Sequence, residues 1–234
     1  MKKGHIDAFQ SFLKWRIHTI FVERPPSLQP MGKGKRVHRH GPYRFYAPIY
    51  DRFIAPSFSE GHSKMYESLG LKSGDRILEV GVGTGISLTF CPEFVQVNAI
   101  DFSSHMLKKA NKRMQKGAIA PEVTFSQMDA HSLEFDDDLF DHSVVAHALA
   151  VVAEPGIVLE EMKRVTKSGG RITIVNHYKK GGGGLTSLVN PFRKRMGLGM
   201  YVEFTELIEQ SGLSLITEER VNRNSSSILV CSVP

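Results

Sequence analysis

Cysteine and long apolar runs are both scarce in this chain of 234 residues. The two cysteines, Cys91 and Cys231, lack the short spacing of a metal site. No cluster of metal ligands is visible either, so we predict no bound metal and a reducing, cytosolic setting. No apolar stretch reaches the roughly 18 residues that a transmembrane helix needs. The hydrophobic fraction of 41% is nevertheless enough to bury a core, so a folded globular protein is expected.

The positive charge of the chain is concentrated near its start. Residues 1–45 contain ten Lys or Arg and two acidic residues, whereas the remainder contains 20 basic and 22 acidic residues. A localised basic segment suits a polyanionic surface, either anionic lipid or nucleic acid. We therefore predict a basic arm over residues 1–45 and a main domain over residues 46–234.

The arm begins with a helical pattern. Apolar residues, including Trp15, recur at helical spacing over residues 6–22, with Lys14 and His18 on the opposite side. A secretory signal is disfavoured because polar residues interrupt the stretch and no small-residue cleavage site follows. Such a helix can lie in the plane of a membrane interface, or it can pack on the main domain or on a partner chain. The proline-rich and glycine-rich residues 23–45 are typical of a linker.

The main domain alternates between strands and helices. A helix is expected within residues 46–70. Strands are predicted at residues 76–80, 95–101, 123–127, 142–147 and 171–176, and helices at residues 103–115 and 157–166. This alternation predicts an α/β, Rossmann-like sheet, mostly parallel, with helices on both faces. Residues 213–221 and 226–233 predict a C-terminal antiparallel hairpin, which completes a seven-stranded sheet.

A glycine-rich motif directly follows the first predicted strand. It reads E-V-G-V-G-T-G over residues 79–85, and Asp101 ends the next strand. Glycine lets a ligand approach the backbone closely, and an acid at the tip of the second strand can accept hydrogen bonds from both ribose hydroxyls. One residue separates each glycine from the next, whereas in the dinucleotide fingerprint two residues separate the last two glycines. The spacing therefore favours a nucleoside lying across the strand ends.

The motif resembles the E-x-G-x-G-x-G motif of class I S-adenosylmethionine-dependent methyltransferases, and the resemblance covers about residues 46–234. It implies S-adenosylmethionine as the cofactor, S-adenosylhomocysteine as the product, and a set of binding residues. The methionine part would lie over Gly81, Gly83 and Gly85, with Thr84 between them and Glu79 nearby, and Asp101 would hold the ribose. The adenine would pack on Phe102 and Met106, and its amino group would be bound by Asp129, with Ala130 beside it. Tyr50 would close over the cofactor, and His147 would face the transferred methyl.

Three stretches carry a narrower resemblance. They read Y-A-P-I-Y-D at residues 46–51, L-E-V-G-V-G-T-G-I-S-L at residues 78–88, and G-R-I-T-I-V-N-H at residues 170–177. Together they resemble bacterial phosphatidylethanolamine N-methyltransferases of the soluble, membrane-associating type. This implies a phospholipid substrate that is methylated on its amine towards phosphatidylcholine. Quinone-ring C-methyltransferases share much of the pattern and remain an alternative.

The charge pattern agrees with a substrate in a membrane. Each Lys or Arg close to an anionic surface contributes ~1 kcal/mol of attraction, so the arm could dock reversibly. A second segment, an insertion at residues 185–195, mixes apolar and basic residues in the same way and follows four consecutive glycines. We therefore expect a cytoplasmic, peripherally membrane-associated protein that contacts anionic lipid through both segments.

An amine acceptor must lose a proton before it can accept a methyl group. Its ordinary pKa is near that of lysine, ~10.4, so it needs a base or a desolvating aromatic cage, and a cage also suits cationic products. The candidates are Tyr46, His147, His177 and Tyr201. RNA methylation is a weaker alternative, because the Asn/Asp-Pro-Pro-aromatic motif of base-amine methylation is absent after the fourth strand, where residues 147–150 read H-A-L-A. A protein that binds the cofactor without catalysing methyl transfer is a further alternative. The sequence does not determine the oligomeric state.

Overall fold

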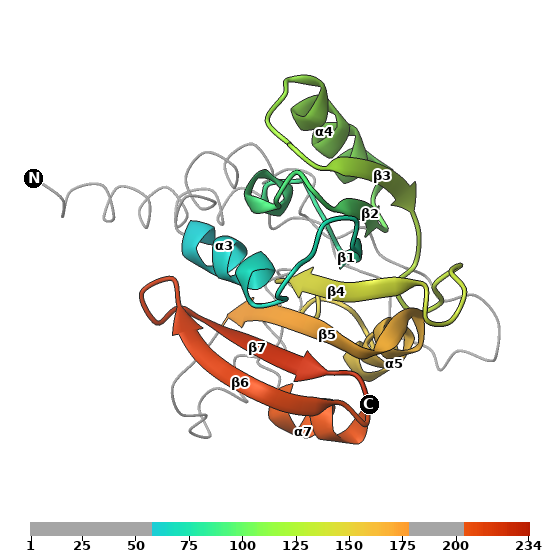
Figure 1. The fold of residues 1–234 in the computed structure, drawn as a ribbon, viewed down its shortest axis with the longest axis vertical. Coiled ribbons are helices and arrows are strands. Elements are labelled where there is room, and N and C mark those ends of the chain that lie inside the picture. The colour runs from blue at the N-terminus through green and yellow to red at the C-terminus, as the bar shows by residue number, and fades with distance from the viewer. Residues whose placement is uncertain (1–57, 178–203) are drawn as a thin grey trace, which may run out of the picture. The chain divides into compact units, whose positions relative to one another are not determined.

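The structure is a computed structural model that describes residues 58–177 and 204–234. In these residues the chain forms a seven-stranded sheet flanked by helices (Figure 1). The strands are β1 (Arg76–Val80), β2 (Gln96–Asp101), β3 (Glu122–Gln127), β4 (Phe140–Ala146), β5 (Thr166–His177), β6 (Ser214–Val221) and β7 (Ser226–Ser232). The helices are α3 (Ser59–Glu67), α4 (Ser104–Gln115), α5 (Pro155–Val165), α7 (Phe204–Gln210) and the 3₁₀ helix η3 (Ser87–Phe90).

The sheet has the predicted Rossmann-like topology. Its strand order is β3-β2-β1-β4-β5-β7-β6. The first five strands pair in parallel, and β7 pairs antiparallel with both β5 and β6. The predicted C-terminal hairpin is therefore confirmed, with β7 inside the sheet and β6 at its edge. Because the parallel strands all end at the same edge, the loops that follow them are brought together there.

Side chains alternate between the two faces of the sheet, and each face has its own core. On one face Ile77 and Val144 pack with residues of α3 and α4. On the other face Leu78 and Val145 pack with residues of α5 and α7. Neighbouring residues of β1 and β4 thus point in opposite directions, and both are fully buried. The helices therefore cover both faces, as the sequence predicted.

Only a short helical element follows the glycine motif. The motif leads only into the single turn η3 rather than into a long helix, because Cys91 precedes Pro92. A residue before proline is driven away from the helical region, and Cys91 is extended, with φ −76° and ψ 134°. Helix α7 was not predicted from the sequence. None of the helices in residues 58–177 and 204–234 is both long and apolar enough to cross a membrane.

Candidate functional site

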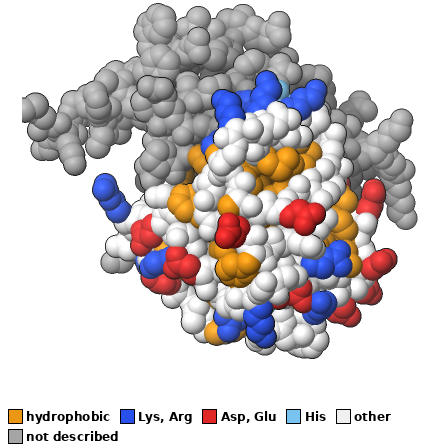
Figure 2. Space-filling view, turned by 45° about the horizontal axis from the view of Figure 1, so that its top comes forward, with side chains coloured by type: hydrophobic (Ala, Val, Ile, Leu, Met, Phe, Trp, Pro, Cys, Tyr) orange, Lys and Arg blue, Asp and Glu red, His pale blue; other side chains and the backbone are white. Residues whose placement is uncertain are grey.

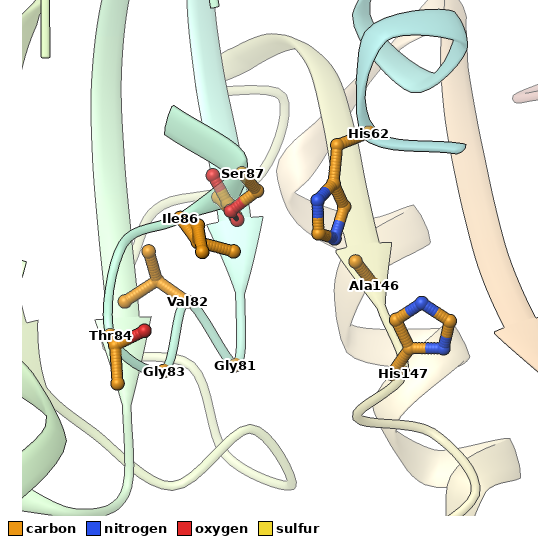
Figure 3. Close-up of a pocket in the computed structure, with 10 residues that line it drawn as sticks. His62, Gly81, Val82, Gly83, Thr84, Ile86, Ser87, Ala146 and His147 are labelled. Carbon is orange, nitrogen blue, oxygen red and sulfur yellow. Dashed lines mark hydrogen bonds between the residues drawn. The ribbon is translucent and has the colours of Figure 1, made fainter. Parts of the chain in front are cut away.

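A cavity of about 90 Å³ lies at the carboxyl edge of the sheet, where β1 and β4 end (Figure 3). All of residues 81–87 except Gly85 line one side, and this segment, which holds the three glycines of the motif and the start of η3, is called the glycine wall below. His62, Ala146 and His147 form the opposite side and are called the imidazole wall. Glu79 also lines the cavity. Segments that are far apart in the sequence therefore share one small space.

The three glycines of the motif have positive φ angles but different neighbours. A Cβ on Gly81, whose φ is 71°, would lie 2.5 Å from the Cβ of Ala148 after β4. A Cβ on Gly85 would lie 3.0 Å from the Cβ of Ala110, because α4 packs directly on the loop. Gly83, with φ 57°, has open space around it, and the nearest atom, the carbonyl oxygen of Gly81, is 4.0 Å from that Cβ position. Only Gly83 thus presents bare backbone to an open site.

Glu79 joins the glycine wall to helix α3. Its carboxylate accepts a hydrogen bond of 2.6 Å from the Tyr66 hydroxyl of α3 and another from the Ser87 hydroxyl of η3. The residue is 1% exposed, and burial raises the pKa of Glu79 to about 7, although both hydrogen bonds act in the opposite direction. The carboxyl group therefore fixes the loop, and its charge is easily lost near neutral pH.

Asp101 fixes the other side of the loop. One carboxylate oxygen accepts the Gly83 N–H at 2.9 Å, and the other accepts the Ser103 N–H at 2.8 Å. Burial raises the pKa of Asp101, and these two backbone hydrogen bonds oppose the shift. Each carboxylate oxygen has a further lone pair, so the group can also accept hydrogen bonds from two vicinal hydroxyls. The residue thus has a structural role and keeps capacity for a ribose.

The residues predicted to hold the adenine lie along the ends of β2 and β3. The Met128 N–H donates to the Asp101 carbonyl at 3.2 Å, which places Asp129 beside the end of β2. The Asp129 carboxylate accepts the backbone N–H of His131 at 3.0 Å and contacts its ring Nδ1 at 2.7 Å. Phe102 is 39% exposed. Met106 lies in the first turn of α4, and Ala130 packs against the core.

His147 directly follows β4 and lines the cavity. Its φ angle is 58°, which ends the strand one residue earlier than predicted. Its backbone N–H donates to the Val175 carbonyl at 2.7 Å, so the turn is tied to β5. Its ring lies 4.8 Å from the ring of Phe58. The residue predicted to face the transferred methyl therefore lies in the cavity wall.

His62 is a cavity residue that the sequence analysis missed. It is 3% exposed, it comes from α3, and its ring points towards Ala146 and His147 (Figure 3). Burial lowers the pKa of His62 to about 4, so its imidazole is neutral at physiological pH. The sequence carried no signal for it, because the hydrogen bond that ties α3 to Glu79 through Tyr66, one helical turn after His62, forms only in the folded chain.

The remaining candidates are less well placed by the structure. His177 ends β5 opposite Ser226 of β7, at the same edge of the sheet as the cavity. Tyr46, Tyr50 and Tyr201 lie outside the described residues, as do the arm at 1–45 and the insertion at 185–195. In residues 58–177 and 204–234, no group of three or more His, Cys, Asp or Glu is arranged to hold a metal ion.

These features fit S-adenosylmethionine. The bare backbone at Gly83 offers a surface that a Cβ would fill, and the adjacent Asp101 carboxylate can accept the ribose hydroxyls. Asp129 lies where the adenine of such a nucleoside would end. The methionine end would then enter the cavity between the two walls. The residues that would hold it are Glu79, Gly81, Gly83 and Thr84, with His147 opposite.

Comparisons with known proteins agree with this fit. A family model described as a methyltransferase domain matches residues 78–174. A phosphatidylethanolamine N-methyltransferase of Cereibacter sphaeroides is 38% identical over 152 residues, which are 60% of this chain and 75% of that protein. A demethylmenaquinone methyltransferase of Paenarthrobacter aurescens is 37% identical over 134 residues, which are 55% of this chain and 50% of that protein.

The fold is also that of solved methyltransferases. The crystal structure of a SAM-dependent methyltransferase from Aquifex aeolicus matches with a TM-score of 0.65 at 20% identity, covering 82% of this chain and 98% of that chain. The relative from Cereibacter sphaeroides is matched over three quarters of its length, far beyond the glycine motif itself. The chain therefore belongs to the class I S-adenosylmethionine-dependent methyltransferases, and S-adenosylmethionine is its cofactor.

Proposed function

We propose that the protein transfers methyl groups from S-adenosylmethionine to the amine of phosphatidylethanolamine and of its mono- and dimethyl forms, towards phosphatidylcholine, at a membrane surface. The observation that carries the proposal is the 38% identity to a phosphatidylethanolamine N-methyltransferase over 75% of that protein. The cavity supports it independently, through the chemistry of its walls.

The imidazole wall suits an amine that must lose a proton. When bound, the cofactor supplies an electrophilic methyl group on sulfur. The rings of His62, which is buried, and of His147, which is half-buried, line the cavity opposite the glycine wall, and the buried Phe58 packs 4.8 Å behind the His147 ring. Withdrawal from water against these rings disfavours an ammonium ion and favours the neutral amine, which has the free lone pair needed for attack. Holding that lone pair close to the methyl is the second contribution of the chain.

Helix α4 adds a basic surface to the described part of the protein. It contains no acidic residue, and Lys108, Lys112 and the following Lys116 lie exposed at intervals of four residues, on one side of the helix. Figure 2 shows Lys and Arg side chains gathered at the top of one face of the molecule, the end at which α4 lies in Figure 1. This surface supports docking to anionic lipid, in addition to the docking proposed for the arm and for residues 185–195.

The test of the substrate is methyl transfer from radiolabelled S-adenosylmethionine to liposomes. One set contains phosphatidylethanolamine with an anionic lipid, and the control set replaces the ethanolamine lipid with phosphatidylcholine. We expect label in mono-, di- and trimethylated lipid from the first set alone. Absence of labelled lipid, with cofactor binding intact, would show that the proposed acceptor is wrong.

The test of the docking surface is vesicle sedimentation. Replacing Lys108, Lys112 and Lys116 together by Gln removes three charges, each contributing ~1 kcal/mol near an anionic surface, so affinity for anionic vesicles should fall roughly 100-fold. Replacing the exposed Lys72, outside α4, should change it only slightly. Equal binding by the triple variant and by the protein itself would exclude α4 from the docking surface.

C-methylation of a membrane quinone precursor is the second candidate. It is favoured by the 37% identity to a demethylmenaquinone methyltransferase, although the match spans only 50% of that protein. A parallel assay with a demethylated menaquinol in the same liposomes separates the two candidates. Label in the quinol fraction and none in phospholipid would favour this alternative.

A further inference from the structure

His62 has an unusual environment for a buried histidine. Its Nδ1 atom is buried, and it has no hydrogen-bond partner among the described residues. Burying a ring nitrogen without a partner is costly, so such atoms are normally paired or face a ligand. Here the ring lines the cavity that the methionine end of the cofactor would enter. The free nitrogen is therefore available to a molecule that enters the cavity.

The surroundings of His62 are aromatic rather than charged. Its ring lies 6.0 Å from the ring of His147, edge to face, and 6.0 Å from the ring of Phe90. Glu79 and His147 are the other titratable groups that line the cavity. Because burial keeps the imidazole neutral, with its pKa at about 4, one ring nitrogen accepts a hydrogen bond and the other donates.

The beginning of α3 is held in place by the turn between β6 and β7. The Gly61 N–H donates to the Asn222 side-chain oxygen at 2.9 Å, and the Asn222 N–H donates to the Glu60 carboxylate at 2.7 Å. The approach is so close that a Cβ on Gly61 would lie 2.7 Å from the Asn222 side-chain nitrogen. His62 is therefore fixed by the C-terminal hairpin, which is separate from the glycine wall.

We propose that His62 is a catalytic residue of the acceptor subsite, and that its Nδ1 accepts a hydrogen bond from the N–H of the amine to be methylated. The assignment rests on the proposed N-methylation. This hydrogen bond orients the amine so that the nitrogen lone pair faces the methyl group. The neutral amine, which has left its proton in water, forms the N–C bond as the S–C bond breaks; the bonding pair stays on sulfur, and the positive charge moves from sulfur to the methylated nitrogen.

This role applies to only part of the reaction sequence. Phosphatidylethanolamine and its monomethyl form each carry at least one N–H when the amine is neutral, but the neutral dimethyl form carries none. His62 can therefore assist the first and second transfers and not the third. A residue that only supported the fold, or only held the cofactor, would affect the three transfers equally.

The experiment compares variants of the full-length protein on three separate acceptors: phosphatidylethanolamine, its monomethyl form and its dimethyl form, each in liposomes of the same anionic lipid content. His62→Phe keeps the ring shape and removes the acceptor nitrogen. His62→Asn places an amide oxygen where Nδ1 was. His105→Phe, at an exposed position of α4, is the matched control. Calorimetry with S-adenosylmethionine follows cofactor binding in each protein.

For His62→Phe we expect kcat/KM to fall roughly 10- to 100-fold on the first two acceptors, because a buried N–H loses its partner. On the dimethyl acceptor kcat/KM should stay within about threefold of wild type, since no N–H needs a partner there. His62→Asn should recover part of the loss, and cofactor affinity should be unchanged in both. The deciding quantity is the kcat/KM on one acceptor divided by the kcat/KM on another for the same variant. A loss of folded protein lowers both values equally and therefore does not change this ratio.

Equal losses on all three acceptors, or no loss on phosphatidylethanolamine, would overturn the assignment of His62 while the proposed function stood. A wild-type protein that methylated none of the three lipids would overturn the proposed function, and this assignment with it.

Discussion

The two walls of the cavity are built in different ways. The glycine wall is one short stretch of chain held by nearby groups, namely Glu79 at its start and Asp101 at the end of the next strand. The imidazole wall joins α3 to the end of β4, and α3 in turn is held by Asn222, 161 residues away from Gly61 in the sequence. In the proposed site, the cofactor side thus depends on local sequence, whereas the acceptor side depends on long-range packing.

The largest expected effect concerns the glycine wall. Asp101→Ala removes the carboxylate that holds Gly83 and that would accept both ribose hydroxyls. Two charge-assisted hydrogen bonds lost together should weaken S-adenosylmethionine binding about a thousandfold, or about 4 kcal/mol, by calorimetry. The exposed Asp136→Ala is the control and should bind normally. Unchanged affinity in Asp101→Ala would show that the nucleoside does not lie on Asp101.

A smaller effect is expected where the glycine wall packs against Ala148, the residue after His147. Gly81→Ala places a Cβ 2.5 Å from Ala148 at a φ of 71°, so we expect a loss of about 3 kcal/mol in the free energy of unfolding from backbone strain and overpacking. Gly117→Ala has nearly the same φ, 70°, with nothing within 4 Å, and should cost only about 1 kcal/mol. Denaturant titration measures both, and equal losses would mean that Ala148 does not restrict the space at Gly81.

The walls should also differ in their response to pH. Burial lowers the pKa of His62 from 6.5 to about 4, and burial raises the pKa of Glu79 from 4.5 to about 7. His62 therefore takes up a proton on unfolding between these values, which destabilises the folded state as pH falls from 6.5 to 4. Glu79 releases a proton on unfolding, which destabilises the folded state as pH rises from 4.5 to 7. The two contributions oppose each other.

Single variants separate these contributions. Relative to the wild type, His62→Phe should gain about 2 kcal/mol in the free energy of unfolding as the pH is lowered from 6.5 to 4. This gain does not depend on how much the substitution changes the stability at pH 6.5. Glu79→Gln should gain a similar amount, relative to the wild type, as the pH is raised from 4.5 to 7. Guanidinium titrations between these pH values measure the differences. Variant curves that run parallel to the wild-type curve would mean that neither group is shifted by burial.

The smallest expected effect tests the attachment of the imidazole wall. Asn222→Gly removes the oxygen that holds the Gly61 N–H but tolerates the φ of 55° at this position. We expect kcat/KM on phosphatidylethanolamine to fall about tenfold, with unchanged cofactor affinity, since one buried hydrogen bond that orients His62 is lost. Asn224→Gly, with a φ of 66° in the same turn, is the matched control. Equal activity of both variants would show that the turn does not position His62.

The sequence predicted the glycine wall and the seven-stranded sheet because both follow from neighbouring residues. Strand β1 and the motif after it are adjacent in the chain, and Asp101 ends the next strand, so periodicity and spacing were sufficient. The short η3 was also readable in principle, since Pro92 prevents a longer helix from continuing through Cys91. His147 was located because it stands at the end of a predicted strand.

The α/β fold and the family follow from the sequence, because both depend on local pattern and on the rule that parallel strands end at one edge. The cofactor-binding residues proposed at that edge stay a prediction. Only the tertiary structure decided that His62 enters the cavity. The packing of α3 against the turn at Asn222, and the close contact of Gly61 that permits it, bring together residues that no local pattern connects. Burial then sets their chemistry, since the exclusion of water lowers the pKa of His62 and raises the pKa of Glu79.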